Sequence, residues 1–230
     1  MKSFVVFLPL IAAFAMAPAH ALDVQVTGEP KLSGGSVFAT IEMDYGGNSY
    51  YSVPLPVLIT FGSAASQINQ IAYCVDIAQD VDIGARYSDY TLTSTGSGQG
   101  FSTQQADMLG RLLTVAGTVD TAQKAMAVQL ATWEIMYDSA SPAFGSGSFY
   151  VPKPAKGSNQ DVFNLSAGYL SQLGSVSSAF VVTKLSSPTA QDLMVFSAVS
   201  AVPEPSQAWM LGCGGLLLVA ALRRGARRAV

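Results

Sequence analysis

The chain has 230 residues, of which 50% are hydrophobic and 12% are charged, and its formal net charge is −3. This apolar content excludes a disordered acidic or basic protein, because such chains lack the apolar surface to form a core. The length predicts one folded domain of ordinary size between two specialised ends.

The first 21 residues have the pattern of a secretory signal peptide. Lys2 precedes an apolar run over residues 4–17, and small residues precede the expected cleavage site after Ala21. His20, the only histidine of the chain, lies inside this segment. A mature protein without histidine excludes Ser-His-Asp and Cys-His catalysis and histidine-ligated metal sites. We therefore expect neither an enzyme nor a bound metal or cofactor.

Residues 22–201 form the predicted extracellular domain. It carries seven basic and 14 acidic residues, a formal charge of −7. No nucleic acid is expected as a partner, because this charge repels a phosphate backbone. Runs rich in Val, Ile, Thr and aromatic residues predict strands over residues 22–27, 36–43, 50–61 and 70–77. Residues 44–48 predict a hairpin turn, and Pro54 and Pro56 predict an edge or bulged strand.

The middle of the domain changes to a helical period. Ser102 and Gln105 have the spacing of a capping box for a helix over residues 103–116. By the same signature a second helix opens at residues 120–123 and runs to Tyr137, and a third is predicted over residues 158–173. Strand-like runs at 179–185 and 193–199 follow. The expected class is α+β, a β-rich sandwich or barrel-like domain with a helical insert.

The second helix contains an unusual polar residue. Helical spacing places Gln129 near the centre of an apolar stripe, and places Glu134 and Asp138 on the opposite, polar face. A buried amide without a partner costs about 1–3 kcal/mol, so Gln129 is expected to be hydrogen-bonded or chemically altered. Cys74 is a candidate partner. Because Cys213 lies in the C-terminal apolar segment, Cys74 is the single thiol of the exported domain.

The segments around these two residues resemble a known family. Tyr73 precedes Cys74, and Gln129 opens the sequence Gln-Leu-Ala-Thr-Trp. Together they resemble the thioester (TQxA-type) domain of bacterial surface adhesins. The resemblance implies an internal thioester between the Cys74 sulfur and the Gln129 acyl group. The further motif positions around that bond are Tyr73, Ala131 and Trp133.

Val128 stands where the family has threonine, so the hydrogen bonds of that hydroxyl are missing. A formed thioester implies a covalent adhesin that reacts once with an amine or hydroxyl of a surface or matrix protein or polysaccharide. The alternative is a non-reactive structural matrix or carbohydrate-binding protein in which Cys74 is merely buried, as free cysteines often are.

An acidic stretch lies between residues 76 and 89. Its carboxylates are oxygen ligands of the type that Ca²⁺ prefers, but the other ligand positions of an EF-hand loop are absent. A solvated loop is the default interpretation. The aspartates concerned are Asp76, Asp80, Asp82 and Asp89.

Residues 202–230 combine three elements in order. A Pro-Glu-Pro motif is followed by an apolar run over residues 208–222 and then by an arginine cluster. The run is shorter than the roughly 20 residues of a usual membrane span, but arginine side chains can snorkel to the interface and hold that end in the cytoplasm. The motif residues are Pro203, Glu204, Pro205, Arg223, Arg224, Arg227 and Arg228.

This C-terminal segment resembles the PEP-CTERM sorting signal. The resemblance implies a single transmembrane sorting helix that is read by an exosortase, a membrane processing enzyme, in a Gram-negative bacterium. The protein is then expected to pass from an inner-membrane-anchored precursor to the cell surface or the extracellular matrix of a biofilm. An ordinary C-terminal membrane anchor is the alternative.

Overall fold

The computed structural model describes residues 21–34, 38–63, 66–93, 95–154 and 157–199. The predicted signal peptide, apart from its last residue, and the predicted sorting signal lie outside these residues. The chain divides into two units, one ending at Ser197 and one beginning at Ala198, and the first holds nearly all described residues. Among the described residues, no helix is both long and apolar enough to cross a membrane.

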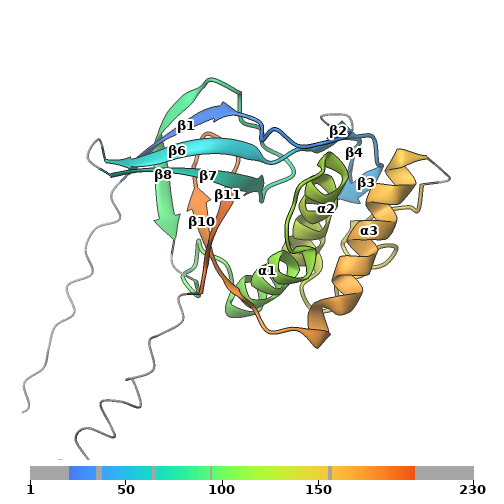
Figure 1. Cartoon of the computed structure of the whole chain (residues 1–230). Coiled ribbons are helices and arrows are strands. Elements are labelled where there is room, and N and C mark those ends of the chain that lie inside the picture. The colour runs from blue at the N-terminus through green and yellow to red at the C-terminus, as the bar shows by residue number, and fades with distance from the viewer. Residues whose placement is uncertain (1–20, 35–37, 64–65, 94, 155–156, 200–230) are drawn as a thin grey trace, which may run out of the picture. The chain divides into compact units, whose positions relative to one another are not determined.

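The larger unit is built around a closed barrel of six strands (Figure 1). The barrel order is β1-β6-β7-β11-β10-β8, and each strand pair with a recorded register is antiparallel. Closure removes the free sheet edges that would otherwise pair with other chains. The six strands are β1 (Leu22–Gly28), β6 (Val57–Ser63), β7 (Ser66–Cys74), β8 (Arg86–Thr93), β10 (Phe180–Ser186) and β11 (Leu193–Ala198).

Alternating side chains of the barrel strands form its core. Val24 and Val26 of β1 are fully buried, and Ile59 and Phe61 of the neighbouring β6 are 1% and 6% exposed. Successive side chains of a strand point to opposite faces, so these residues share the inner face of the barrel. The predicted barrel-like, β-rich α+β class is therefore confirmed for this unit.

Two small sheets accompany the barrel. The predicted hairpin is present, with Gly46 and Gly47 at positive φ between β3 and β4, as tight hairpin turns require. Pro54 lies in β5, an edge strand of the two-stranded sheet β2-β5, as predicted, but Pro56 lies between β5 and β6, and β6 pairs with β1 and β7 on its two sides. The small strands are β2 (Phe38–Ala39), β3 (Met43–Tyr45), β4 (Asn48–Tyr50), β5 (Val53–Pro54) and β9 (Phe149–Tyr150).

Three helices lie in the chain between the paired barrel strands β8 and β10, so the helical part is an insert. They are α1 (Thr103–Ala116), α2 (Ala122–Asp138) and α3 (Ser158–Gln172), the last followed by a 3₁₀ turn at Leu173–Ser175. The predicted capping box is present, because Ser102 accepts from the Gln105 N–H and Gln105 accepts from the Ser102 N–H.

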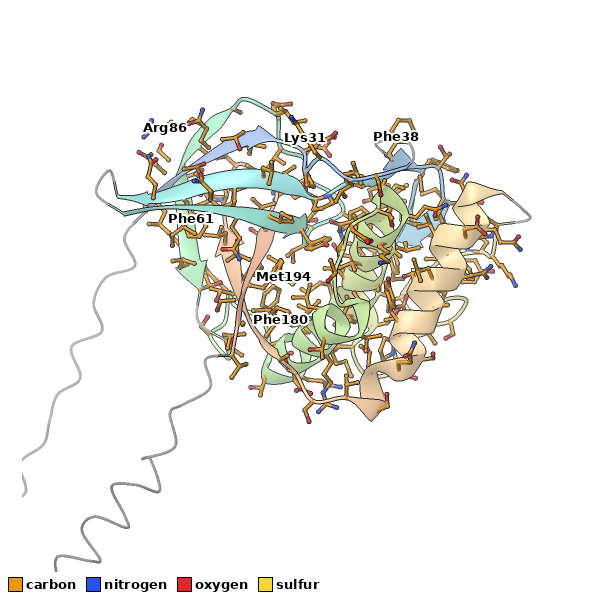
Figure 2. All side chains as sticks on the ribbon, in the orientation of Figure 1. Lys31, Phe38, Phe61, Arg86, Phe180 and Met194 are labelled. Atoms are coloured by element: carbon orange, nitrogen blue, oxygen red, sulfur yellow. The ribbon has the colours of Figure 1, made fainter. Side chains whose placement is uncertain are left out.

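Helix α2 occupies the centre of the insert. It contacts α1, α3 and strand β7, whereas α1 packs on strand β10 (Figure 1). Met194 and Phe180 lie between the barrel strands and the helices (Figure 2), and Met194 is fully buried. The barrel and the helical insert therefore share one hydrophobic core.

Three parts of the sheet structure differ from the prediction. The expected strand over residues 36–43 is replaced by the short β2 and β3, and the expected strand over residues 50–61 is divided between the end of β4, β5 and β6. Strand β8 was not predicted. Strand β8 has few apolar residues, and its ladder partners β1 and β10 are far away in sequence. Its β structure depends on those distant partners rather than on its own composition.

Two helix glycines provide a matched stability test. A Cβ at Gly110 of α1 would lie 2.1 Å from Ser178 Oγ and 2.7 Å from the Phe180 carbonyl oxygen, whereas a Cβ at Gly168 of α3 meets nothing within 4 Å. We expect Gly168→Ala to raise the free energy of unfolding by about 0.5–1 kcal/mol through helix propensity, and Gly110→Ala to lower it by about 1–3 kcal/mol through overpacking.

Urea unfolding of the two variants beside the wild type measures both changes. An equal gain in stability for both variants would contradict the close packing of α1 on β10.

Candidate functional site at Cys74 and Gln129

Cys74 is the last residue of strand β7, where it pairs with Leu193 of β11. It is a free cysteine and is 2% exposed. Burial, with a smaller contribution from the charge of Asp80, raises the pKa of the Cys74 thiol to about 12. The group is therefore a protonated thiol at neutral pH and does not react as an exposed thiolate would.

Gln129 lies in the middle of α2 and is fully buried. Its Oε1 accepts a hydrogen bond from the Cys74 N–H at 2.9 Å, and its Nε2 donates to the Cys74 carbonyl oxygen at 2.8 Å. The expected partner of this buried amide is thus the backbone of Cys74. Because the two bonds hold the amide from both sides, the acyl carbon Cδ is kept beside the residue that carries the thiol.

The residue before Gln129 differs from the family motif but leaves this geometry intact. Val128 is fully buried, and its carbonyl accepts a hydrogen bond from Thr132 Oγ1 at 2.8 Å. Both polar atoms of the Gln129 side chain already have partners in the Cys74 backbone. The orientation of the amide therefore does not depend on a hydroxyl at position 128.

The other predicted motif residues are buried as well. Ala131 is fully buried and Trp133 is 2% exposed, both on α2 with Gln129. Tyr73 is 1% exposed, and its ring lies 6.3 Å from the Phe196 ring, centroid to centroid. Since successive strand side chains point to opposite faces, Tyr73 and Cys74 face different sides of β7. Ala131 and Trp133 thus lie on helix α2 with Gln129, whereas Tyr73 of β7 packs against Phe196 of strand β11.

Residues distant in sequence hold the segment that follows Cys74. The Val75 N–H donates to the Asp192 carbonyl at 2.8 Å, and the Ile77 N–H donates to Tyr137 Oη at 3.0 Å.

Gln191 donates from Nε2 to the Asp76 carbonyl at 2.5 Å. Tyr90, fully buried, donates to the Gln191 carbonyl at 2.6 Å. No local sequence pattern indicated Gln191 or Tyr90 as supports of this site, whereas helical spacing placed Tyr137 on the same face of the helix as Gln129.

A pocket of about 290 Å³ lies beside these residues. Trp133, one helical turn beyond Gln129, and Ile77, three residues beyond Cys74, contribute to its wall. The Trp133 indole Nε1–H is buried and has no acceptor among the described residues. The remaining wall includes Tyr50, Tyr51, Asp80 and Gln191.

The prediction that Glu134 lies on a polar face of the helix is wrong. Glu134 is fully buried, and its Oε1 accepts a hydrogen bond from the Ala143 N–H at 2.7 Å. Every residue of α2 from Ala125 to Ile135 is buried, because helices, strand β7 and the segment after α2 surround it. Helical periodicity cannot indicate a polar face on a helix that is covered all round.

Asp138, predicted on the same polar face, organises a turn. Its Oδ1 accepts from the Ser148 N–H at 2.9 Å and its Oδ2 from the Phe149 N–H at 2.6 Å. These bonds connect the end of α2 to the start of β9.

The aspartates of the acidic stretch have separate environments. Asp76 Oδ1 accepts from the Ala78 N–H, and Asp89 accepts from the hydroxyls of Ser187 and Thr189. The Thr189 hydrogen bond is the largest cause that lowers the pKa of Asp89; burial opposes it, and the Ser187 hydrogen bond lowers the pKa further. In the described ranges, no group of three or more His, Cys, Asp or Glu residues is arranged to hold a metal ion.

Comparisons with protein-family models, with curated proteins and with solved structures find no match to this chain. The interpretation of the site therefore depends on its geometry and on the sequence resemblances stated above. The residues predicted for sorting, Pro203 to Pro205 and the terminal arginines, lie outside the described residues.

Glu134 predicts a distinctive pH dependence of stability. Burial raises its pKa to about 7, with a smaller addition from the charge of Asp138 and against the Ala143 hydrogen bond. A carboxyl group whose pKa is raised in the folded state adds to the free energy of unfolding while it is protonated. This contribution is fully present below the pKa of the unfolded state. It is lost as the pH rises through the folded-state pKa of about 7. At pH 8, we expect the free energy of unfolding of Glu134→Gln to be higher than that of the wild type by roughly 2–3 kcal/mol.

The same comparison at pH 5 should give a difference close to zero. Urea unfolding at both pH values measures it, and Glu42→Gln, at an exposed glutamate, is the control. If the stabilities of the wild type and of Glu134→Gln change with pH in the same way, the claim that Glu134 is a buried carboxylate with a raised pKa is contradicted.

Proposed function

We propose that the chain is an exported surface or matrix protein that attaches covalently to a neighbouring molecule through an internal thioester between Cys74 and Gln129. The observation that carries the proposal is the reciprocal pair of hydrogen bonds between the Gln129 amide and the Cys74 backbone. The two residues are 55 positions apart, on a strand and on a helix, and both are buried. Their meeting supports the resemblance to the thioester domain of surface adhesins.

Formation of the thioester is a condensation. The Cys74 sulfur attacks Gln129 Cδ, a C–S bond forms, the C–N bond of the amide breaks, and the thiol proton leaves with the nitrogen as ammonia. The product is an acyl group with a far better leaving group than an amide, ready for attack by an amine or a hydroxyl. Cys74 and Gln129 are nearly inaccessible to solvent, which slows hydrolysis of the stored electrophile.

The final reaction joins the protein to its target once. An attacking amine forms an amide with the Gln129 acyl group, and Cys74 returns to a thiol. The protein is then consumed as a reactant, so the activity is covalent adhesion to a surface or matrix protein or polysaccharide rather than turnover catalysis.

Delivery to the surface is part of the same proposal. The signal peptide over residues 1–21 would export the domain, and the PEP-CTERM segment over residues 202–230 would hold it in the inner membrane until an exosortase processes it. The support is the ordered sequence of the Pro-Glu-Pro motif, the apolar run and the arginine cluster. The formal charge of −7 of residues 22–201 suits a soluble external domain.

A second candidate function is non-covalent binding of a matrix carbohydrate, with Cys74 merely buried. A pocket of about 470 Å³ on the barrel supports it, because hydrogen-bonding groups line it. Lys184 and Asp192 form an ion pair there at 2.7 Å, and Asp89, Thr91 and Ser187 add further polar atoms. A saccharide binds through such groups without any covalent step.

The intact mass of the full chain separates the two candidates. We expect the wild type to be lighter than its sequence by one ammonia, and incubation with methylamine to raise the mass to one CH₂ above the sequence value, because N-methylglutamine replaces Gln129. Cys74→Ala should keep its sequence mass under both conditions.

Cys213→Ala is the matched control, since it removes the other cysteine and should keep both mass changes. The three proteins are compared with the same termini, so terminal processing does not affect the differences. A wild-type mass without the ammonia loss, and unchanged by methylamine, would contradict the thioester and favour the carbohydrate-binding candidate.

A further inference from the structure

The pocket beside the Cys74–Gln129 pair has the chemical character of a cation site. Asp80 is its one carboxylate, and no lysine or arginine belongs to its wall. Among the described residues, no cation pairs with the Asp80 carboxylate. The pocket therefore presents a negative charge that no protein group neutralises.

Aromatic side chains complete this character. Tyr50 and Tyr51 line the same pocket, and Tyr51 is 56% exposed. Tyrosine faces attract ammonium groups through the negative face of the ring, and a nearby carboxylate adds to the attraction. A carboxylate and two tyrosines in the wall of a pocket are better suited to a positively charged amine than to a neutral hydroxyl or an anion.

The pocket also adjoins the reacting residues. Trp133 in its wall is one turn of α2 beyond Gln129, and Ile77 in its wall is three residues beyond Cys74. The charge of Asp80 adds to the effect of burial in raising the pKa of the Cys74 thiol. Cys74 and Gln129 do not themselves line the pocket, but one turn of α2 and three residues of the segment after β7 connect its wall to them.

We propose that this pocket receives the attacking nucleophile, that the nucleophile is a primary amine, and that Asp80 is the residue that selects amines over hydroxide. This inference rests on the proposed thioester and adds a specificity-determining residue to it. Asp80 acts by charge alone, since it attracts the ammonium form, stabilises the positive charge that develops on the attacking nitrogen, and repels hydroxide.

The reaction balances with water as the only base. An ammonium ion attracted into the pocket first gives one proton to water, and the resulting neutral amine attacks Gln129 Cδ, so that a C–N bond forms and the C–S bond to Cys74 breaks. One proton of the nitrogen passes to the departing sulfur, which becomes a thiol. Asp80 keeps its charge throughout.

The test compares Asp80→Asn with the matched variant Asp82→Asn in the full chain. Asp82 is exposed, lies two residues away and is not part of the pocket wall, so both variants remove one charge from the same loop. The probes are methylamine and water at a fixed pH. Intact mass distinguishes the two products, since methylamine leaves N-methylglutamine at position 129 and water leaves glutamate.

We expect Asp80→Asn to keep the ammonia deficit, to react with methylamine about tenfold more slowly than wild type, and to hydrolyse at an equal or higher rate. Asp82→Asn should stay close to wild type in both rates. The rate with methylamine divided by the rate of hydrolysis should therefore fall in Asp80→Asn. A variant that merely loosened the packing around the thioester would not show this fall, because looser packing accelerates both reactions.

The role of Asp80 would be overturned if Asp80→Asn and Asp82→Asn reacted with methylamine at equal rates, or if both the methylamine and the hydrolysis rates rose in Asp80→Asn. Either result would leave the proposed thioester itself intact. A wild type without the ammonia deficit would instead overturn the proposed thioester, and this inference with it.

Discussion

Two hydrogen bonds between the Gln129 side chain and the Cys74 backbone join the helical insert to the barrel at the end of strand β7. Both polar atoms of a fully buried amide are satisfied there, and so are the N–H and carbonyl of Cys74. Removal of the amide would leave two buried backbone groups without partners, each at a cost of about 1–3 kcal/mol. The contact that joins helix α2 to the barrel is therefore also the contact that holds the Gln129 amide against the backbone of the residue that carries the thiol.

The surroundings of this contact suit a stored electrophile. Cys74 and Gln129 are buried where helix α2 contacts strand β7, so water reaches neither readily. Burial keeps the Cys74 thiol protonated, and a thiolate released by an attacking amine is expected to take up a proton because burial raises the pKa of this group to about 12. The chemistry proposed for the domain needs no histidine, and residues 22–201 contain none.

Local sequence signals predicted the parts of the fold that local interactions determine. Helix α1 begins at Ser102 because its capping box involves only nearby residues, and Gln129 was identified because a lone amide in an apolar stripe needs a partner. The burial of Glu134 and the strand character of β8 were not predictable in this way, because distant segments cover or pair with them. Gln191 was missed for the same reason, since it contacts Asp76 across 115 residues.

The account's central claim is that the Cys74 sulfur is acylated by Gln129, and alkylation of Cys74 in denaturant tests it most directly. The full chain is unfolded briefly in denaturant with a maleimide at mildly acidic pH, with and without prior methylamine, and the peptide that contains Cys74 is weighed. The account predicts that Cys74 escapes alkylation in the untreated protein and is alkylated after methylamine, which releases the thiol. Complete alkylation of Cys74 in the untreated, unfolded protein would contradict the account.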